Sequence, residues 1–151
     1  EGCDGLKDIT VPNSVTDIGN FAFSSSGLTS VTIPTNVTTI GIGAFSACTN
    51  LIAITVNAHN SVYSSLDGVM FNKIQTGTLV QYPGGKTGSY TVPNNVTNIG
   101  AYAFFFCTSL TSVIIPASVT DIGYAAFYGC NSLTAAYFRG NAPSLGPGAS
   151  A

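Results

Sequence analysis

Four cysteines, one histidine and six carboxylate residues are the side chains of this 151-residue sequence that could form a metal site or an active site. The cysteines are Cys3, Cys48, Cys107 and Cys130, and no two of them have the CxxC spacing of a zinc site. His59 has no cysteine close to it, and the sequence contains no GxSxG nucleophile elbow. We therefore expect no metal, no cofactor and no catalytic residue, and we predict that the chain is not an enzyme.

Charged ligands are disfavoured as well. The chain has four basic and six acidic residues and a net charge of −2, so it has no basic surface for nucleic acid or for an anionic membrane. The segment Gly84-Gly85-Lys86-Thr87 is similar to the end of a phosphate-binding loop, but the upstream glycine of such a loop is missing. No apolar run approaches the roughly 20 residues that a membrane-spanning helix needs. We expect neither nucleic-acid binding nor membrane insertion.

The elements that would position these residues follow from a repeated unit. It reads Leu-x-x-(Ile/Val)-x-(Ile/Val)-Pro-x-x-Val-Thr-x-Ile-Gly-x-x-Ala-Phe-x-x-Cys and recurs in steps of 22 or 23 residues. Its starts are Leu6, Leu28, Leu51, Leu110 and Leu133. This period is typical of leucine-rich solenoids, in which each repeat forms one coil and identical positions lie above each other.

Each unit predicts one strand and one return path. The alternating apolar pairs favour short strands that begin at residues 9, 31, 54, 80, 90, 113 and 136, which gives about seven strand-bearing coils in a single domain over residues 1–151. We expect a right-handed coil with these strands in a parallel sheet on the concave side. The Ala-Phe return path is too short for an ordinary helix, so we expect helical turns or irregular arcs on the convex side.

Residues 57–89 depart from the repeat. Asp67-Gly68 stands between two apolar stretches, which predicts a tight turn and a β-hairpin insert near residues 60–80, on the convex side. Both ends of the sequence fall within a repeat. A solenoid without polar caps exposes its apolar end faces, so we expect a longer parent chain or packing of another body on these ends.

A family resemblance is carried by the segment Leu28-Thr-Ser-Val-Thr-Ile-Pro-Thr-Asn-Val-Thr-Thr-Ile-Gly-Ile-Gly-Ala-Phe-Ser-Ala-Cys48. It resembles the BspA-like leucine-rich repeats of bacterial surface proteins, and the likeness covers nearly the whole chain. Residues 67–86 are similar to an insert of this family, and residues 137–143 to one of its late repeats. The resemblance implies secretion or display at the cell surface and, in some members, adhesion to host proteins.

The position of the cysteines and of two aspartates within the repeat predicts their surroundings. All four cysteines occupy one position of the unit, where Ser26 stands in another repeat, so we expect buried free thiols in a column. A disulfide between Cys107 and Cys130, on adjacent coils, stays open as the alternative. Asp17 and Asp121 share another position and would lie roughly 20 Å apart, too far for joint acid–base catalysis.

Two surfaces remain as candidate binding sites. The first is the column of outward residues at the middle of each strand, and its alternative is that threonine is simply a good strand residue. Its members are Thr10, Thr32, Thr55, Gln81, Thr91, Ile114 and Tyr137. The second is a group of aromatic residues beside the Ala-Phe pairs, and its alternative is that these rings cover gaps in the arcs or contact a neighbouring domain. Its members are Tyr102, Phe105, Phe106, Tyr124 and Tyr128.

The sequence therefore predicts a non-catalytic binding or adhesion module of a secreted or cell-surface protein, which recognises an extracellular protein or a glycan. A structural spacer is the alternative. An ice- or crystal-binding solenoid is a third possibility, although Gln81, Ile114 and Tyr137 interrupt the regular threonines that a flat lattice match needs.

Overall fold

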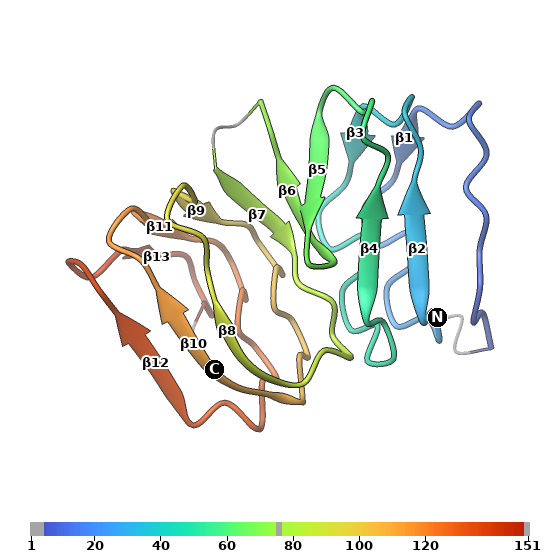
Figure 1. Ribbon diagram of the computed structural model, residues 1–151. Coiled ribbons are helices and arrows are strands. Elements are labelled where there is room, and N and C mark those ends of the chain that lie inside the picture. The colour runs from blue at the N-terminus through green and yellow to red at the C-terminus, as the bar shows by residue number, and fades with distance from the viewer. Residues whose placement is uncertain (1–4, 75–76, 150–151) are drawn as a thin grey trace.

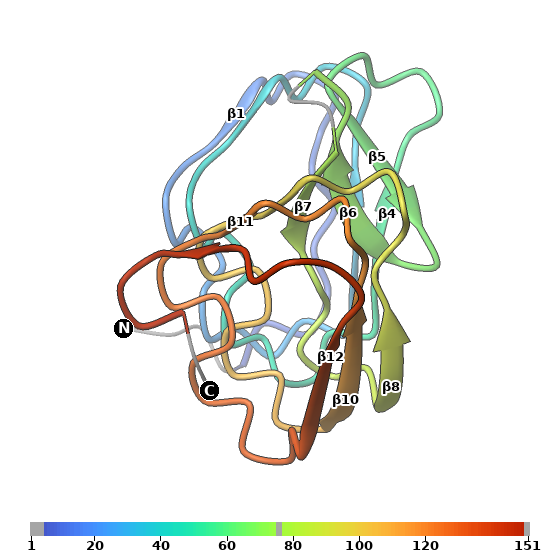
Figure 2. The ribbon, with the colours of Figure 1, turned by 90° about the vertical axis from the view of Figure 1, so that its left-hand side faces the viewer.

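The computed structural model describes residues 5–74 and 77–149. The described chain winds as a solenoid and contains strands and turns but no helix (Figure 1). We number its coils I (6–27), II (28–50), III (51–87), IV (88–109), V (110–132) and VI (133–149). Coils II, IV, V and VI each have a long strand on one side and a short strand on the other, joined by loops. Coil I has a short strand and only an isolated bridge at Thr10, and coil III has a long strand followed by a hairpin and a further strand. Figure 2 looks nearly along the stack, where the coils overlie one another.

The long strands are parallel, as expected, but they form two sheets. They are β2 (Ser30–Ile33), β4 (Ala53–Val56), β8 (Gly88–Thr91), β10 (Leu110–Ile115) and β12 (Ala135–Phe138). β2 pairs with β4, and an isolated bridge from Thr10 to Thr32 extends this sheet to coil I. β10 pairs with β8 and β12. The alternation of the sequence is visible in β2, where Val31 and Ile33 are buried and the two residues between and before them are exposed.

The short strands are the two residues that precede the glycine at the Ile-Gly position of the unit, which is Leu145-Gly146 in coil VI, and the sequence analysis did not assign them. They are β1 (Asp17–Ile18), β3 (Thr39–Ile40), β9 (Asn98–Ile99), β11 (Asp121–Ile122) and β13 (Ser144–Leu145). β1 pairs with β3, whereas β9 and β13 both pair with β11. Two residues are too short a run for the alternation that marks a strand in a sequence.

The hairpin insert is confirmed, with β5 (Tyr63–Leu66) and β6 (Val69–Asn72) joined antiparallel by Asp67 and Gly68. Both turn residues have positive φ, at 51° and 78°, which is the geometry of a two-residue hairpin turn. Its expected place on the convex side is wrong. The amide of Ile54 donates to the carbonyl of Gly68 at 2.9 Å, so the hairpin lies against β4, within the wall of the solenoid (Figure 1).

The hairpin divides the hydrophobic core in two. One cluster includes Phe45 of coil II, and the other includes Phe104 of coil IV. Adjacent residues of β6 belong to different clusters, because Met70 packs into the first and Val69 into the second. Neighbouring side chains of a strand point to opposite faces. A strand that is apolar on both faces therefore lies between the two halves, and an exposed convex position would leave one face unburied.

The strand expected at residues 80–82 belongs to the other side of the solenoid. β7 (Thr78–Gln81) is antiparallel to β6 and parallel to β9, with Leu79 opposite Ile99. Leu79 thus takes the inward place of the isoleucine of the short strands. The placement of Gln81 in the outward column is therefore wrong, and its side chain is only 3% exposed. In the described chain this leaves six coils instead of about seven.

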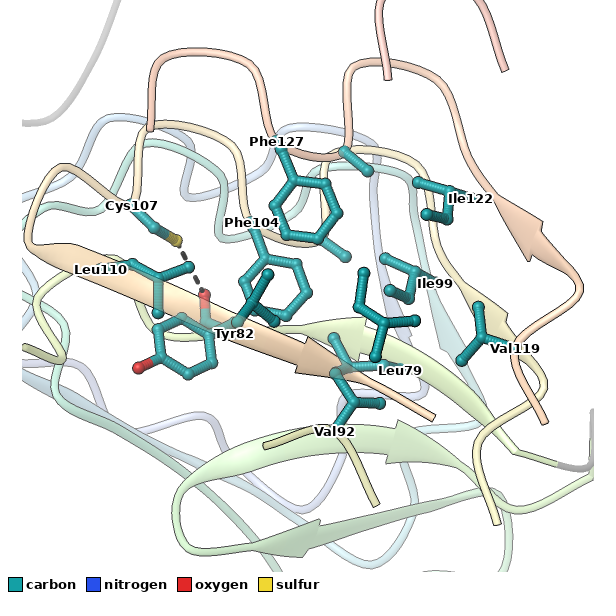
Figure 3. Close-up of a cluster of buried hydrophobic side chains, with 14 of the residues drawn as sticks. Leu79, Tyr82, Val92, Ile99, Phe104, Cys107, Leu110, Val119, Ile122 and Phe127 are labelled. Atoms are coloured by element: carbon teal, nitrogen blue, oxygen red, sulfur yellow. Dashed lines mark hydrogen bonds between the residues drawn. The ribbon is translucent and has the colours of Figure 1, made fainter. Parts of the chain in front are cut away.

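Aromatic rings stack through the second cluster. Tyr82, the last ring of coil III, lies parallel to Phe104 with centroids 5.0 Å apart, and Phe104 lies parallel to Phe127 at 4.7 Å (Figure 3). Tyr82 thus occupies the phenylalanine position of a shortened coil. At the far end of the described chain, Phe138 and Leu145 are exposed around an apolar hollow of about 270 Å³. The inward residues of coil VI are therefore packed on one side only.

Candidate functional site

The cysteine column is structural. Cys48, Cys107 and Cys130 are buried and free, which confirms the expected thiols for these three, while Cys3 lies outside the described residues. Each thiol donates to the carbonyl of the ring residue in the preceding coil: Cys48 to Phe23 at 3.0 Å, Cys107 to Tyr82 at 3.9 Å, and Cys130 to Phe104 at 3.0 Å. Burial raises the pKa of the Cys48 thiol. The neighbouring Cys130 thiol and burial raise the pKa of Cys107.

The acidic residues and the histidine are dispersed. Asp17 lies in β1 and Asp121 in β11, which belong to different sheets. Hydrogen bonds from the Thr16 and Thr39 side chains lower the pKa of the exposed Asp17 carboxyl, and the Thr120 hydroxyl donates to Asp121 at 2.7 Å. Among the described residues, no group of three or more His, Cys, Asp or Glu side chains could hold a metal ion. The described part of the chain also forms no helix long and apolar enough to cross a membrane.

The outward column of the long strands is divided by the hairpin. Thr10, Thr32 and Thr55 lie side by side and are exposed on the first sheet. Ile114 lies between Thr91 and Tyr137 on the second sheet. Gln81 lies on neither. The expected strip of seven residues is therefore two strips of three, each spanning roughly 10 Å at the spacing of paired strands.

The aromatic residues, in contrast, form one connected surface, which we call the aromatic patch: Phe21, Tyr102, Phe105, Phe106, Tyr124 and Tyr128. Within coil IV the ring of Phe105 lies 5.0 Å from Tyr102 and 4.8 Å from Phe106. Tyr124 and Tyr128 of coil V join them, at 5.4 Å from Tyr102 and 5.5 Å from Phe105. These separations are typical of interacting aromatic pairs.

Phe21 of coil I extends the patch, and sequence reasoning missed it. Its ring meets that of Tyr102 edge-on, with centroids 5.2 Å apart. In coil II the same position is Gly43, and a Cβ atom there would lie 2.5 Å from the Phe21 ring. The absence of a side chain at Gly43 therefore leaves room for the Phe21 ring to reach Tyr102. The shared slot of Phe21 and Tyr102 in the repeat is the signal that could have linked them, but the sequence does not show that coil III lacks an intervening arc.

Much of the patch is open to solvent. Phe21, Tyr124 and Tyr128 are 46%, 51% and 54% exposed, and the other three rings are half-buried. Contiguous exposed apolar patches often mark surfaces that contact a partner. The arcs that carry them, residues 19–26, 100–107 and 123–130, contain no charged residue. The patch can therefore form apolar and ring-stacking contacts and tyrosine hydrogen bonds, but no ion pairs of its own.

Three of the rings are attached to strained backbone. Phe21, Tyr102 and Phe106 have φ values of 54°, 60° and 55°, in the left-handed region that bulky residues rarely adopt. Such conformations cost on the order of 1 to 3 kcal/mol each and concentrate at functional sites. The arcs maintain them because alternate backbone amides are bonded between coils, as from Tyr102 to the Tyr124 carbonyl at 3.0 Å. Residues outside the patch at the same two repeat positions, such as Ala125 and Ala47, have positive φ as well, so this conformation belongs to the repeat.

Comparisons with known proteins agree with this architecture. The model of the family described as "BspA type Leucine rich repeat region" matches residues 1–83 and 81–149, in six copies. No curated protein matches the chain significantly.

Similar solved structures come from bacteria. A leucine-rich cell surface protein of Faecalibacterium prausnitzii A2-165 is 37% identical, with a TM-score of 0.83 over 90% of this chain and 36% of its own. A leucine-rich repeat protein of Eubacterium ventriosum is 30% identical, with a TM-score of 0.80 over 89% of this chain and 42% of its own. The pneumococcal vaccine antigen PcpA is 29% identical, with a TM-score of 0.77 over 82% and 31%. The chain thus spans less than half the length of each of these proteins.

Proposed function

The chain belongs to the BspA-type leucine-rich repeat family, and we propose that it is a non-catalytic binding module of a bacterial surface protein, which engages a protein or a glycan through the aromatic patch. The observation that carries the proposal is the contact network of six rings from three coils, three of them about half exposed. The F. prausnitzii structure of a cell surface protein supports the location outside the cell.

The aromatic patch is favoured over the strand column for two reasons. The column is interrupted by the hairpin and offers mostly threonine, which a solvent-facing strand would contain in any case. The patch is continuous across coils and consists of large rigid side chains, which supply most of the binding energy in known interfaces. Tyrosine adds a hydroxyl that can hydrogen-bond to a peptide or to a sugar.

Replacing patch residues by those of the sister repeats tests the proposal without altering the fold. Tyr124 corresponds to Asn20 and Tyr128 to Ser24, so the double variant Tyr124→Asn/Tyr128→Ser removes two exposed rings while it keeps the repeat pattern. Tyr137→Thr is the matched control, because it removes one exposed ring from the strand column and restores the residue found there in other coils.

Glycan and protein arrays with the three proteins are the measurement. We expect a ligand of the parent to be retained by Tyr137→Thr and to bind the double variant at least about tenfold more weakly, the loss of roughly 1.4 kcal/mol. Loss with Tyr137→Thr alone would assign binding to the strand column instead. An absence of any ligand would favour the spacer.

A further inference from the structure

The arcs of this solenoid are joined by a regular pattern of backbone hydrogen bonds. In coil I the amides of Phe21 and Phe23 donate to the carbonyls of Ile42 and Ala44 in coil II, at 3.0 and 2.8 Å. In coil IV the amides of Tyr102 and Phe104 donate in the same way to Tyr124 and Ala126 of coil V, at 3.0 and 2.8 Å. Every second amide of one arc therefore donates a hydrogen bond to every second carbonyl of the next arc.

Coil II lacks this partner. Gly43 and Phe45 are the residues that correspond to Phe21 and Phe23, and their amides donate to no acceptor among the described residues. Only Ala47, further along the arc, reaches the next full arc, with its amide 3.3 Å from the Phe105 carbonyl. The reason is the shortened coil III, which ends its inward path at Tyr82 and provides no complete arc. Gly43 and Phe45 are buried, and buried backbone amides are rarely left unpaired.

The two amides belong to residues that line a half-open cavity of about 440 Å³ between coil II and the hairpin and β7 of coil III, with Gly100 and Ala101 of coil IV at its border. Gln81 lines it as well. The Gln81 amide nitrogen donates to the carbonyls of Tyr82 and Ala103, at 3.1 and 3.2 Å, which fixes the orientation of the side chain. Its carbonyl oxygen accepts no hydrogen bond from the described residues. The residues that line the cavity thus include two with unbonded amide donors, in the register of an arc, and one with an unbonded carbonyl acceptor, among the described residues.

The size of the cavity indicates a ligand larger than isolated waters. At about 30 Å³ per molecule, it would hold roughly fifteen waters, and it falls within the 300 to 1,000 Å³ range of ligand pockets. We propose that this cavity binds an extended peptide segment of another protein. Two alternate carbonyls of the segment accept from Gly43 and Phe45, and an amide donates to Gln81. Tyr82 supplies the end of an arc in coil III, with its amide bonded to the Ala103 carbonyl, and the peptide takes the place of the missing part that precedes it, a form of strand addition.

An acetylated and amidated hexapeptide, Gly-Tyr-Ala-Ala-Phe-Tyr, is a suitable probe because it copies residues 123–128, whose carbonyls accept from an arc in this protein. In the free protein we expect the Gly43 and Phe45 amides to exchange with solvent about 100-fold faster than those of Phe21 and Phe23. Addition of the peptide should shift the NMR signals of Gly43 and Phe45 and slow their exchange.

Two variants locate the binding. Ile42 borders the cavity and is 54% exposed, so Ile42→Asp should weaken binding of the peptide about tenfold or more. Ile52 is 58% exposed and does not line the cavity, so Ile52→Asp should bind like the parent. The double variant Tyr124→Asn/Tyr128→Ser should also bind it like the parent, which separates this site from the aromatic patch.

Four results would overturn the proposal. Slow exchange of Gly43 and Phe45 in the free protein would show that the chain itself provides their acceptors. Fast exchange without any response to the peptide would show a cavity that is only hydrated. Signal changes that persist in Ile42→Asp, or that depend on protein concentration alone, would place the peptide elsewhere or point to self-association.

Discussion

The ring of Phe21 lies edge-on against the ring of Tyr102, at an interplanar angle of 84°, although coils II and III separate the two residues in the chain. The contact exists because coil II has Gly43 at this position and coil III has no complete arc. It joins residues on the two sides of the boundary between the hydrophobic clusters. The aromatic patch is therefore continuous where the core is divided.

Replacement of Gly43 by alanine should separate these rings. The new Cβ atom would lie 2.5 Å from the Phe21 ring, and the residue would keep a φ of 63°. Gly148→Ala is the control, because Gly148 has a φ of 65° and open space around it. Left-handed backbone costs an alanine about 1 to 2 kcal/mol in both variants. We expect Gly43→Ala to cost about 1 kcal/mol more, the value of an aromatic contact. Equal losses in denaturant unfolding would contradict this role of Gly43.

Removal of the Phe104 side chain should create a cavity in the second cluster. The ring is fully buried between Tyr82 and Phe127. We expect Phe104→Ala to lower the free energy of unfolding by about 3 to 5 kcal/mol. Phe23 occupies the same repeat position but is only partly buried, so Phe23→Ala should cost less. Urea titrations of both variants give the comparison, and a Phe104→Ala protein as stable as its parent would be incompatible with the stacked column.

The cysteines should be inaccessible until the protein unfolds. Cys48, Cys107 and Cys130 are buried, so a reagent has no access to them in the folded protein, and the pKa of Cys48 and of Cys107 is raised, so few thiolates form at these two near neutral pH. A thiol reagent should therefore modify these three only in denaturant, where four free thiols are expected in total. Peptide mapping by mass spectrometry identifies the modified positions. Rapid modification of any of the three in the native protein, or a total below four, would show that the column is open or oxidised.

Alkaline pH should destabilise the protein through the buried Tyr82 and the partly buried Tyr90. Burial, with a smaller effect of Cys107, raises the pKa of Tyr82 to about 12, and burial also raises that of Tyr90. Tyrosines of the unfolded chain ionise near pH 10. The neutral Tyr82 hydroxyl therefore makes its full contribution to the free energy of unfolding below pH 10, and this contribution is lost as the pH rises through about 12. In Tyr82→Phe, which restores the usual residue of the column, the transition followed by circular dichroism should shift to higher pH. An unchanged midpoint would assign it to other groups.

The repeat pattern predicted most of the fold because position in a column determines burial. Val31, Phe45 and Cys48 are buried, as the pattern requires, and the Asp67-Gly68 turn was found from its residue types alone. The pattern failed at Val80-Gln81-Tyr82-Pro83, which has the same residue order as a long strand. This segment instead lies at the end of β7, which pairs with β6 of the hairpin and with β9. That pairing depends on tertiary structure, and no local sequence pattern indicates it.

For the aromatic patch, too, the sequence predicts the residues within adjacent coils but not the contacts that depend on tertiary structure. Five of the six rings were identified because two adjacent coils carry them in unusual slots. Phe21 required knowledge of which coils adjoin after the insert, and that depends on β6. A signal was present, since Val69 and Met70 are both apolar and successive strand residues face opposite ways. An apolar pair of this kind indicates a strand buried on both faces.

Because the hydrophobic core is divided into two clusters, we expect the two parts of the solenoid around them to unfold separately when the chain is pulled or heated. Phe21 lies on one part, and Tyr102, Tyr124 and Tyr128 lie on the other. A partner that contacts Phe21 and the tyrosines at the same time would link the two parts, so the solenoid would be more rigid in the bound state. If the proposed partner contacts rings on both parts, the solenoid would resist tension best in the bound state.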